Sequence, residues 1–250
     1  MTLNKMTLTG CLVTVALGGS FAQAASLNYG TFVSDDVTFE NVTESSGTGT
    51  LPLQGAPASV AQNAMTFNPT TFESSSVGAP GASIIDSQLR TIISSNSNSV
   101  GIVSIDLFET GDYTIIGGPG TFAIASVSAP VFVDIIEVDG VAIDGPELAT
   151  NLFITPGSGV YDLGIDGVGV GVIWSGDLTI DIVALAASAS ITGNVTGVEL
   201  TFDNTLSTSN GNGAAAFIKK KLTKIDVEIV PEPASAALLS LGLAGLMRRR

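Results

Sequence analysis

The fold is decided by strict alternation, clearest in Val198-Glu199-Leu200-Thr201-Phe202-Asp203, and the same pattern recurs at residues 103–107 and 224–229. Apolar and polar residues take turns in each of these segments. A period of two puts one set of side chains on a buried face and the other in water, as in antiparallel sheets covered on one side. Longer apolar runs at residues 131–136 and 170–174 predict strands covered on both faces or lying between two sheets.

Small residues and Asp-Gly pairs separate these segments, as expected for tight turns between strands. The predicted turns lie at residues 139–140, 144–145, 166–167 and 176–177. Only residues 86–93 and 183–189 are plausible helices, and for the first we favour a strand. The chain is otherwise poor in long helix formers. It therefore predicts an all-β fold, a single antiparallel β-sandwich or jelly-roll-like domain over residues 25–229.

The N-terminal 24 residues have the layout of a secretory signal peptide. Lys5 is followed by an apolar run, Leu8 to Leu17, and by the cleavage pattern Ala22-Gln23-Ala24. Leu8-Thr9-Gly10-Cys11 fits a lipoprotein box by its letters, but most of the apolar run follows Cys11, which favours an ordinary leader. We expect residues 1–24 to be removed after export through the general secretion machinery.

Three elements follow one another at the C-terminus, in residues 230–250. They are the box Pro231-Glu232-Pro233, an uncharged apolar run from Ala234 to Met247, and a cluster of three arginines, Arg248, Arg249 and Arg250. As a helix, the apolar run would be about 21 Å long. This is short of the roughly 30 Å hydrocarbon core, so the run suits a transient stop in the inner membrane. The arginines would remain cytoplasmic and leave the rest of the chain outside.

This order of box, apolar helix and arginine cluster resembles the PEP-CTERM sorting signal of Gram-negative, biofilm-forming bacteria. The resemblance implies that an exosortase, a membrane-embedded transpeptidase-like enzyme, recognises the tail and processes the chain near Pro231-Glu232-Pro233. The product would then be released or attached at the cell surface. An ordinary tail anchor is the alternative, but it would not need the Pro-Glu-Pro box.

The part between the two ends is acidic and lacks both histidine and cysteine. The whole chain has a formal charge of −14; without Lys5, the three C-terminal arginines and Glu232, this becomes −17. Such a surface repels nucleic acid, which we exclude as a partner. Without cysteine and histidine, residues 25–229 cannot form disulfides, thiolate metal sites, or the Ser-His-Asp and Cys-His arrangements of catalysis.

Carboxylates are the remaining candidates for chemistry, and calcium is the cation that they would bind. The candidate positions are Asp35 with Asp36, Asp139 with Asp144, and Asp162 with Asp166. None has the spacing of the twelve-residue calcium loop of EF-hands. Turn-forming aspartates explain the same pattern. We therefore predict no cofactor, with calcium as the alternative.

One basic run, Lys219-Lys220-Lys221 with Lys224, stands out on the acidic chain. It could bind acidic exopolysaccharide, but we favour a solvated strand edge that discourages aggregation. Trp174 and the scattered tyrosines Tyr29, Tyr113 and Tyr161 could form a sugar platform. Because Trp174 lies in an apolar run, we expect it in the core.

The sequence thus predicts an exported, non-enzymatic protein of the cell surface or extracellular matrix, associated with biofilm exopolysaccharide. A carbohydrate- or calcium-binding lectin-like module is the alternative. A glycosidase that uses two carboxylates is a third possibility.

Overall fold

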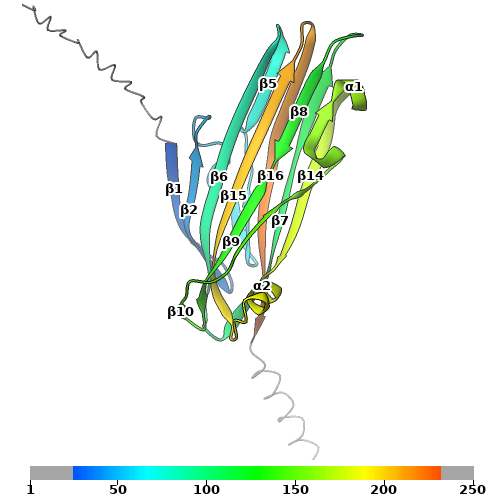
Figure 1. Ribbon diagram of the computed structural model, residues 1–250. Coiled ribbons are helices and arrows are strands. Elements are labelled where there is room, and N and C mark those ends of the chain that lie inside the picture. Colours follow the sequence, from blue (N-terminus) through cyan, green and yellow to red (C-terminus); the bar gives the residue numbers. More distant parts are fainter. Residues whose placement is uncertain (1–24, 232–250) are drawn as a thin grey trace, which may run out of the picture.

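The computed structural model describes residues 25–231, which form two antiparallel sheets that face each other (Figure 1). In the first sheet the strand order is β1-β2-β6-β15-β8-β13, with β9 also beside β15, and β10 and β11 beside β9. Its strands are β1 (Ala25–Val33), β2 (Val37–Ser46), β6 (Gly81–Ser95), β8 (Ala123–Ser128), β9 (Pro130–Val138), β10 (Val141–Ala142), β11 (Glu147–Asn151), β13 (Val160–Asp162) and β15 (Val195–Asn210).

The second sheet has the order β12-β14-β7-β16-β4-β3, with β5 also paired to β16. Its strands are β3 (Ser59–Ala61), β4 (Ala64–Phe67), β5 (Glu73–Gly78), β7 (Val100–Ile116), β12 (Phe153–Thr155), β14 (Gly169–Asp181) and β16 (Ala214–Pro231). The short helices are α1 (Leu163–Asp166), α2 (Ile182–Ser188) and the 3-10 turn η1 (Gly157–Gly159). The predicted all-β, jelly-roll-like sandwich is confirmed.

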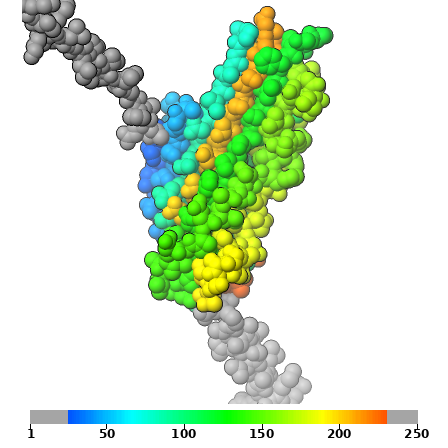
Figure 2. All heavy atoms as spheres, in the orientation of Figure 1, coloured from blue at the N-terminus to red at the C-terminus, as the bar shows by residue number. Residues whose placement is uncertain are grey.

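The long strands β6, β7, β15 and β16 run the length of the molecule, and their inward faces enclose the core (Figure 1). Figure 2 shows β15 as an orange band along one face, with β9 and α2 at its lower end. Large side chains such as Phe39, Phe67, Phe202 and Trp174 are fully buried between the sheets. Each contributes about 1.5–3 kcal/mol or more by leaving water, so the interface between the sheets is the main source of stability.

The alternating segments lie where the pattern predicted. Residues 103–107, 198–203 and 224–229 belong to β7, β15 and β16, and residues 86–93 belong to the strand β6. The second ambiguous segment is helical, as α2. That helix starts after Asp181, whose carboxylate accepts a hydrogen bond from the N–H of Ala184 at 2.8 Å.

Two predictions about β14 are wrong. Val170 and Ile173 are each 72% exposed, so this apolar run is not covered on both faces. Gly176-Asp177 lies inside β14 and does not form a turn. A glycine fits here because β12 pairs alongside: a Cβ at Gly176 would lie 2.5 Å from the side chain of Ile154, its partner in β12.

Within residues 25–231, no helix is long and apolar enough to cross a membrane. The predicted membrane segment, residues 234–247, lies outside the described residues.

Candidate functional site

The end of β16 joins the fold to the predicted sorting tail. Pro231, the first residue of the Pro-Glu-Pro box, is the last residue of the strand, and its backbone is in register with Val100 of β7. The other predicted sorting and cleavage residues lie outside the described residues. They are Ala22, Ala24, Glu232, Pro233, Arg248, Arg249 and Arg250.

A groove of about 450 Å³ opens beside this end of β16, next to α2. Its walls come from the start of β7, from α2 and from the segment before β15, and they include Val103, Val183, Ile191 and Val230. The lining is mainly apolar and contains no carboxylate. The groove therefore does not supply the pair of acids that a glycosidase requires.

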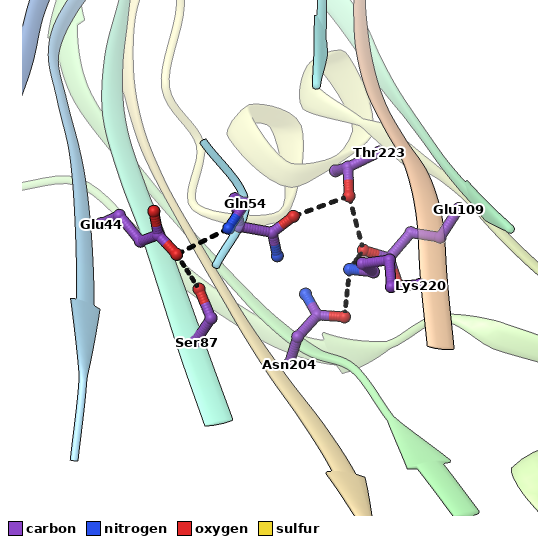
Figure 3. A network of polar contacts seen from close by, with 7 residues as sticks. All are labelled: Glu44, Gln54, Ser87, Glu109, Asn204, Lys220 and Thr223. Atoms are coloured by element: carbon purple, nitrogen blue, oxygen red, sulfur yellow. Dashed lines mark hydrogen bonds and ion pairs between the residues drawn. The ribbon is translucent and has the colours of Figure 1, made fainter. Parts of the chain in front are cut away.

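The most unusual group of side chains lies between the sheets and is shown in Figure 3. We call it the interior polar cluster. It consists of Glu44, Gln54, Ser87, Glu109, Asn204, Lys220 and Thr223. All seven side chains are buried, with at most 1% exposure. Buried polar groups are costly unless they are paired, so this cluster calls for a physical explanation.

Lys220 points inward because β16 changes its alternation at a β-bulge. Residues 214, 216, 218 and 220 face the core, whereas residues 223, 225 and 227 do so after the bulge. The register with β7 shifts between Lys220 and Leu222. Such an extra residue reverses which side chains face inward. Gly111 of β7 lies opposite Lys220. A glycine is required there, because a Cβ would collide with the Lys219 carbonyl and with Trp174.

Glu109 and Asn204 meet Lys220 from β7 and from the opposite sheet. Lys220 Nζ forms an ion pair with Glu109 Oε1 and donates to Asn204 Oδ1 at 2.5 Å. The rings of Phe202 and Phe72 lie 5.1 Å and 5.6 Å from the Lys220 nitrogen. Burial lowers the pKa of Lys220 well below its usual range, against the opposing effect of the negative charge of Glu44.

The other half of the cluster is organised by Glu44. One of its carboxylate oxygens accepts hydrogen bonds from the N–H groups of Leu53 and Gln54, at 2.9 and 2.8 Å, and from the Ser87 hydroxyl at 2.9 Å. The other oxygen accepts from the hydroxyl of Tyr29. Burial, followed by the hydrogen bond and charge of Glu44, raises the pKa of Tyr29. Glu44 is thus fully satisfied and fixes the segment after β2 over the sheet.

Thr223 links the two halves. Its hydroxyl lies 3.2 Å from Gln54 Oε1 and 3.3 Å from Glu109 Oε1. Around Lys220, not every buried polar atom is hydrogen-bonded. The atoms without a hydrogen-bond partner among the described residues are Glu109 Oε2, Asn204 Nδ2 and Gln54 Nε2.

The prediction that Lys219-Lys220-Lys221 with Lys224 forms a solvated strand edge is therefore wrong. Lys220 is in the core, and β16 is an inner strand, with β7 on one side and β5 and β4 on the other. The other three lysines of this segment each have an acidic partner. Lys219 pairs with Glu73, Lys221 with Asp112 and Lys224 with Asp226, at 2.9, 2.8 and 2.5 Å.

The calcium candidates lie in connecting segments or at the ends of short elements, with Asp162 at the end of β13 and Asp166 at the end of α1. The Asp139 carboxylate accepts from the N–H of Asn194 at 2.9 Å. The Asp162 carboxylate accepts from Gly164 N–H, and the Asp166 carboxylate from Asp162 N–H, both at 2.7 Å. Asp144 is exposed between β10 and β11, and Asp35 and Asp36 lie in the bend between β1 and β2. Across residues 25–231, no three acidic side chains come together as metal ligands.

Trp174 lies in the core as expected, with no exposed surface. Tyr113 and Tyr161 stack on each other, with ring centroids 3.7 Å apart, and both are buried. These aromatic side chains stabilise the sandwich and do not form an exposed platform.

Several solved structures resemble the sandwich distantly. TmCBM61, solved in complex with beta-1,4-galactotriose, is 12% identical over 68% of this chain and 70% of its own, with a TM-score of 0.25. The enzymatically active domain of bacteriophage CBA120 tailspike protein 4 is 12% identical over 88% of this chain and 22% of its own, with a TM-score of 0.22. A loop-swap mutant of a Neocallimastix patriciarum xylanase is 11% identical over 85% and 98%, with a TM-score of 0.21. At these TM-scores the likeness has no bearing on function.

No curated protein sequence matches the chain. Residues 230–250, in contrast, match the family model of the PEP-CTERM protein-sorting motif. The match begins at Val230, so the motif starts within the last residues of β16. The chain is therefore a PEP-CTERM motif-bearing protein, exported and sorted through a membrane.

Proposed function

We propose that an exosortase processes this chain near Pro231-Glu232-Pro233 and that the sandwich then remains outside the cell as a non-enzymatic component of the surface or of the biofilm matrix. The observation that carries the proposal is the sorting motif at residues 230–250. The motif follows directly on the last strand, with no separate linker domain between them.

The position of Pro231 fits removal of the tail. A cut after this residue leaves every described strand whole, because β16 ends there. The acidic surface fits a dispersed extracellular protein, since like charges keep the molecules apart. Exopolysaccharide is the partner that we propose for the matrix.

The test uses the full-length chain in a Gram-negative host that contains an exosortase. The wild-type protein should appear in the surface or medium fraction, with a mass that lacks residues 1–24 and the tail. The triple variant R248A/R249A/R250A should accumulate as an unprocessed form with the tail intact, because without the arginines the tail no longer stops in the membrane where the exosortase acts. The matched control is K219A/K221A/K224A, which removes the same charge from the folded domain and should be processed normally.

Normal processing of the triple arginine variant would contradict the proposal, and so would a wild-type product that stays in the cytosol with both ends intact. A glycan array with and without calcium tests the lectin-like alternative. Saturable binding to one glycan would favour that alternative over a purely structural role.

A further inference from the structure

Three side chains with complementary chemistry meet in the core. The amine of Lys220, the carboxamide of Asn204 and the carboxyl group of Glu109 come from β16, β15 and β7. Lys220 Nζ lies 2.5 Å from Asn204 Oδ1 and is in direct contact with Glu109 Oε1. The carboxamide carbon is one carbonyl bond beyond Oδ1, so it lies within about 3.7 Å of the amine. This is close to the separation of a near-attack arrangement.

The surroundings favour a neutral, nucleophilic amine. Lys220, Glu109 and Asn204 have no exposed surface, and Phe72 and Phe202 flank the nitrogen. A separated ammonium and carboxylate are costly in such a place. Transfer of one proton from Lys220 to Glu109 removes both charges. Burial lowers the pKa of Lys220 in the direction that this transfer requires.

If Lys220, Glu109 and Asn204 made only non-covalent contacts, some of their buried polar atoms would lack hydrogen-bond partners. Asn204 Nδ2 and Glu109 Oε2 have no hydrogen-bond partner among residues 25–231. By comparison, Glu44 in the same cluster accepts four hydrogen bonds. Buried unpaired polar atoms in a native core call for an explanation, and a chemical role is one of the explanations that fit them.

We propose that Lys220 and Asn204 join spontaneously in an intramolecular amide bond, with Glu109 as the proton carrier. The lone pair of the neutral Lys220 Nζ attacks Asn204 Cγ, and a C–N bond forms while the carbonyl π electrons move to Oδ1. The carboxylic acid of Glu109 protonates the departing nitrogen, Nδ2, and takes up a proton from Nζ. The bond from Cγ to Nδ2 then breaks, the carbonyl re-forms and ammonia leaves. No oxidant, metal or second substrate is consumed.

Asn204 is the acyl donor because this assignment gives every group a function. If Glu109 were the acyl donor, water would leave and no carboxyl group touching Lys220 would remain to carry the proton. The bond with Asn204 also links β15 to β16 across the two sheets, in a domain that has no cysteine for a disulfide.

Peptide mapping of the exported product, expressed from the full-length chain, tests the bond. Digestion with trypsin and a glutamyl endopeptidase cuts after Glu199, Lys219 and Lys221. The wild type should yield a branched peptide in which Lys220-Lys221 is attached to residues 200–219. Its mass should be lower than the sum of the two peptides by about 17 Da, one ammonia. Ring closure at Asn210-Gly211 would lose the same mass but would not attach Lys220-Lys221.

The variant E109Q keeps the shape of the side chain but cannot carry the proton. Its ratio of branched to linear peptide should fall by about a hundredfold. The matched control is E73Q, at an exposed glutamate paired with Lys219, and it should branch like the wild type. N204A, which has no acyl group, should give only linear peptide, and circular dichroism reports whether each variant is folded.

A folded wild-type protein that yields only linear peptides would overturn the proposal. A branch from Lys220 to Glu109, with loss of water, would overturn the assignment of Asn204 as the acyl donor. Full branching in folded E109Q would overturn the assignment of Glu109 as the proton carrier.

Discussion

Removal of Glu109 should destabilise the sandwich far more than removal of a surface glutamate. Glu109 has no exposed surface and contacts the equally buried Lys220. With Glu109 removed, the buried Lys220 amine stays unbonded and has no group to take its proton, and removing one partner of such a buried pair costs about 3–5 kcal/mol. E109A also prevents the proposed bond, which closes a loop from residue 204 to residue 220, and a loop of about 16 residues contributes about 3 kcal/mol by chain entropy. We therefore expect E109A to lose about 6–8 kcal/mol.

Urea unfolding measures this loss, because the single tryptophan, Trp174, is fully buried and its fluorescence reports on the core. The control E73A removes a half-exposed partner of Lys219 and should cost less than about 1 kcal/mol. The double variant E109A/K220M removes both partners, so it should avoid the cost of the unpaired Lys220 amine but should still lack the stabilisation from loop closure. Equal stability of E109A and E73A would refute the account of the interior polar cluster.

Four further predictions concern other parts of the fold. G111A should lower the free energy of unfolding by about 3 kcal/mol in the urea assay, because a Cβ collides with the Lys219 carbonyl and Trp174. D181A should cost about 1 kcal/mol, because α2 loses its N-terminal cap; the helical circular dichroism signal checks this. Burial first, and then the charges of Tyr113 and Asp166, raise the pKa of Tyr161 above its ordinary value of 10.0. The stability that Tyr161 contributes is therefore complete below pH 10 and is lost above it, by about 1.4 kcal/mol per pH unit, and Y161F should show a smaller alkaline loss in unfolding titrations. In single-molecule stretching from residue 25 to residue 231, the fully unfolded wild type should be about 55 Å shorter than N204A, since about 16 residues stay inside the closed loop.

Two of the three side chains of the proposed reaction, Glu109 and Asn204, could be placed in the core from the sequence. The alternation of Val103, Ile105 and Leu107 continues to Glu109, and that of Val198, Leu200 and Phe202 continues to Asn204. The structure keeps Ile105, Leu107 and Glu109, and the row from Val198 to Asn204, on the inward face. Val103 lies beyond a register shift and lines the groove beside α2. A charged or amide residue at the next inward position of an alternating segment therefore predicts a buried polar side chain.

Lys220 could not be placed in the same way. Counting back by twos from Val227 and Ile225 puts Lys221 and Lys219 inside and Lys220 outside. The bulge between Lys220 and Leu222 reverses this order. The bulge depends on the partner strand, where Gly111 lets the backbone of β16 come close, and so it is a property of the pairing and not of the run of lysines.

The sorting tail and the polar cluster are connected through one strand. β16 carries Lys220 in its middle and passes into the sorting motif at its end, so a pull on the processed C-terminus, once it is attached to the cell surface, enters the sandwich near Pro231. Between Pro231 and Lys220, peeling of the strand is resisted by backbone hydrogen bonds to β7 and β4, by side-chain packing and by a few side-chain contacts, such as the Lys221–Asp112 ion pair and the Thr223–Gln54 hydrogen bond. At Lys220 the proposed bond would pass the load covalently to β15, which pairs with β6 along most of its length and belongs to the opposite sheet. A pull from the anchored end would then have to separate the whole sandwich, and could not remove its last strand alone.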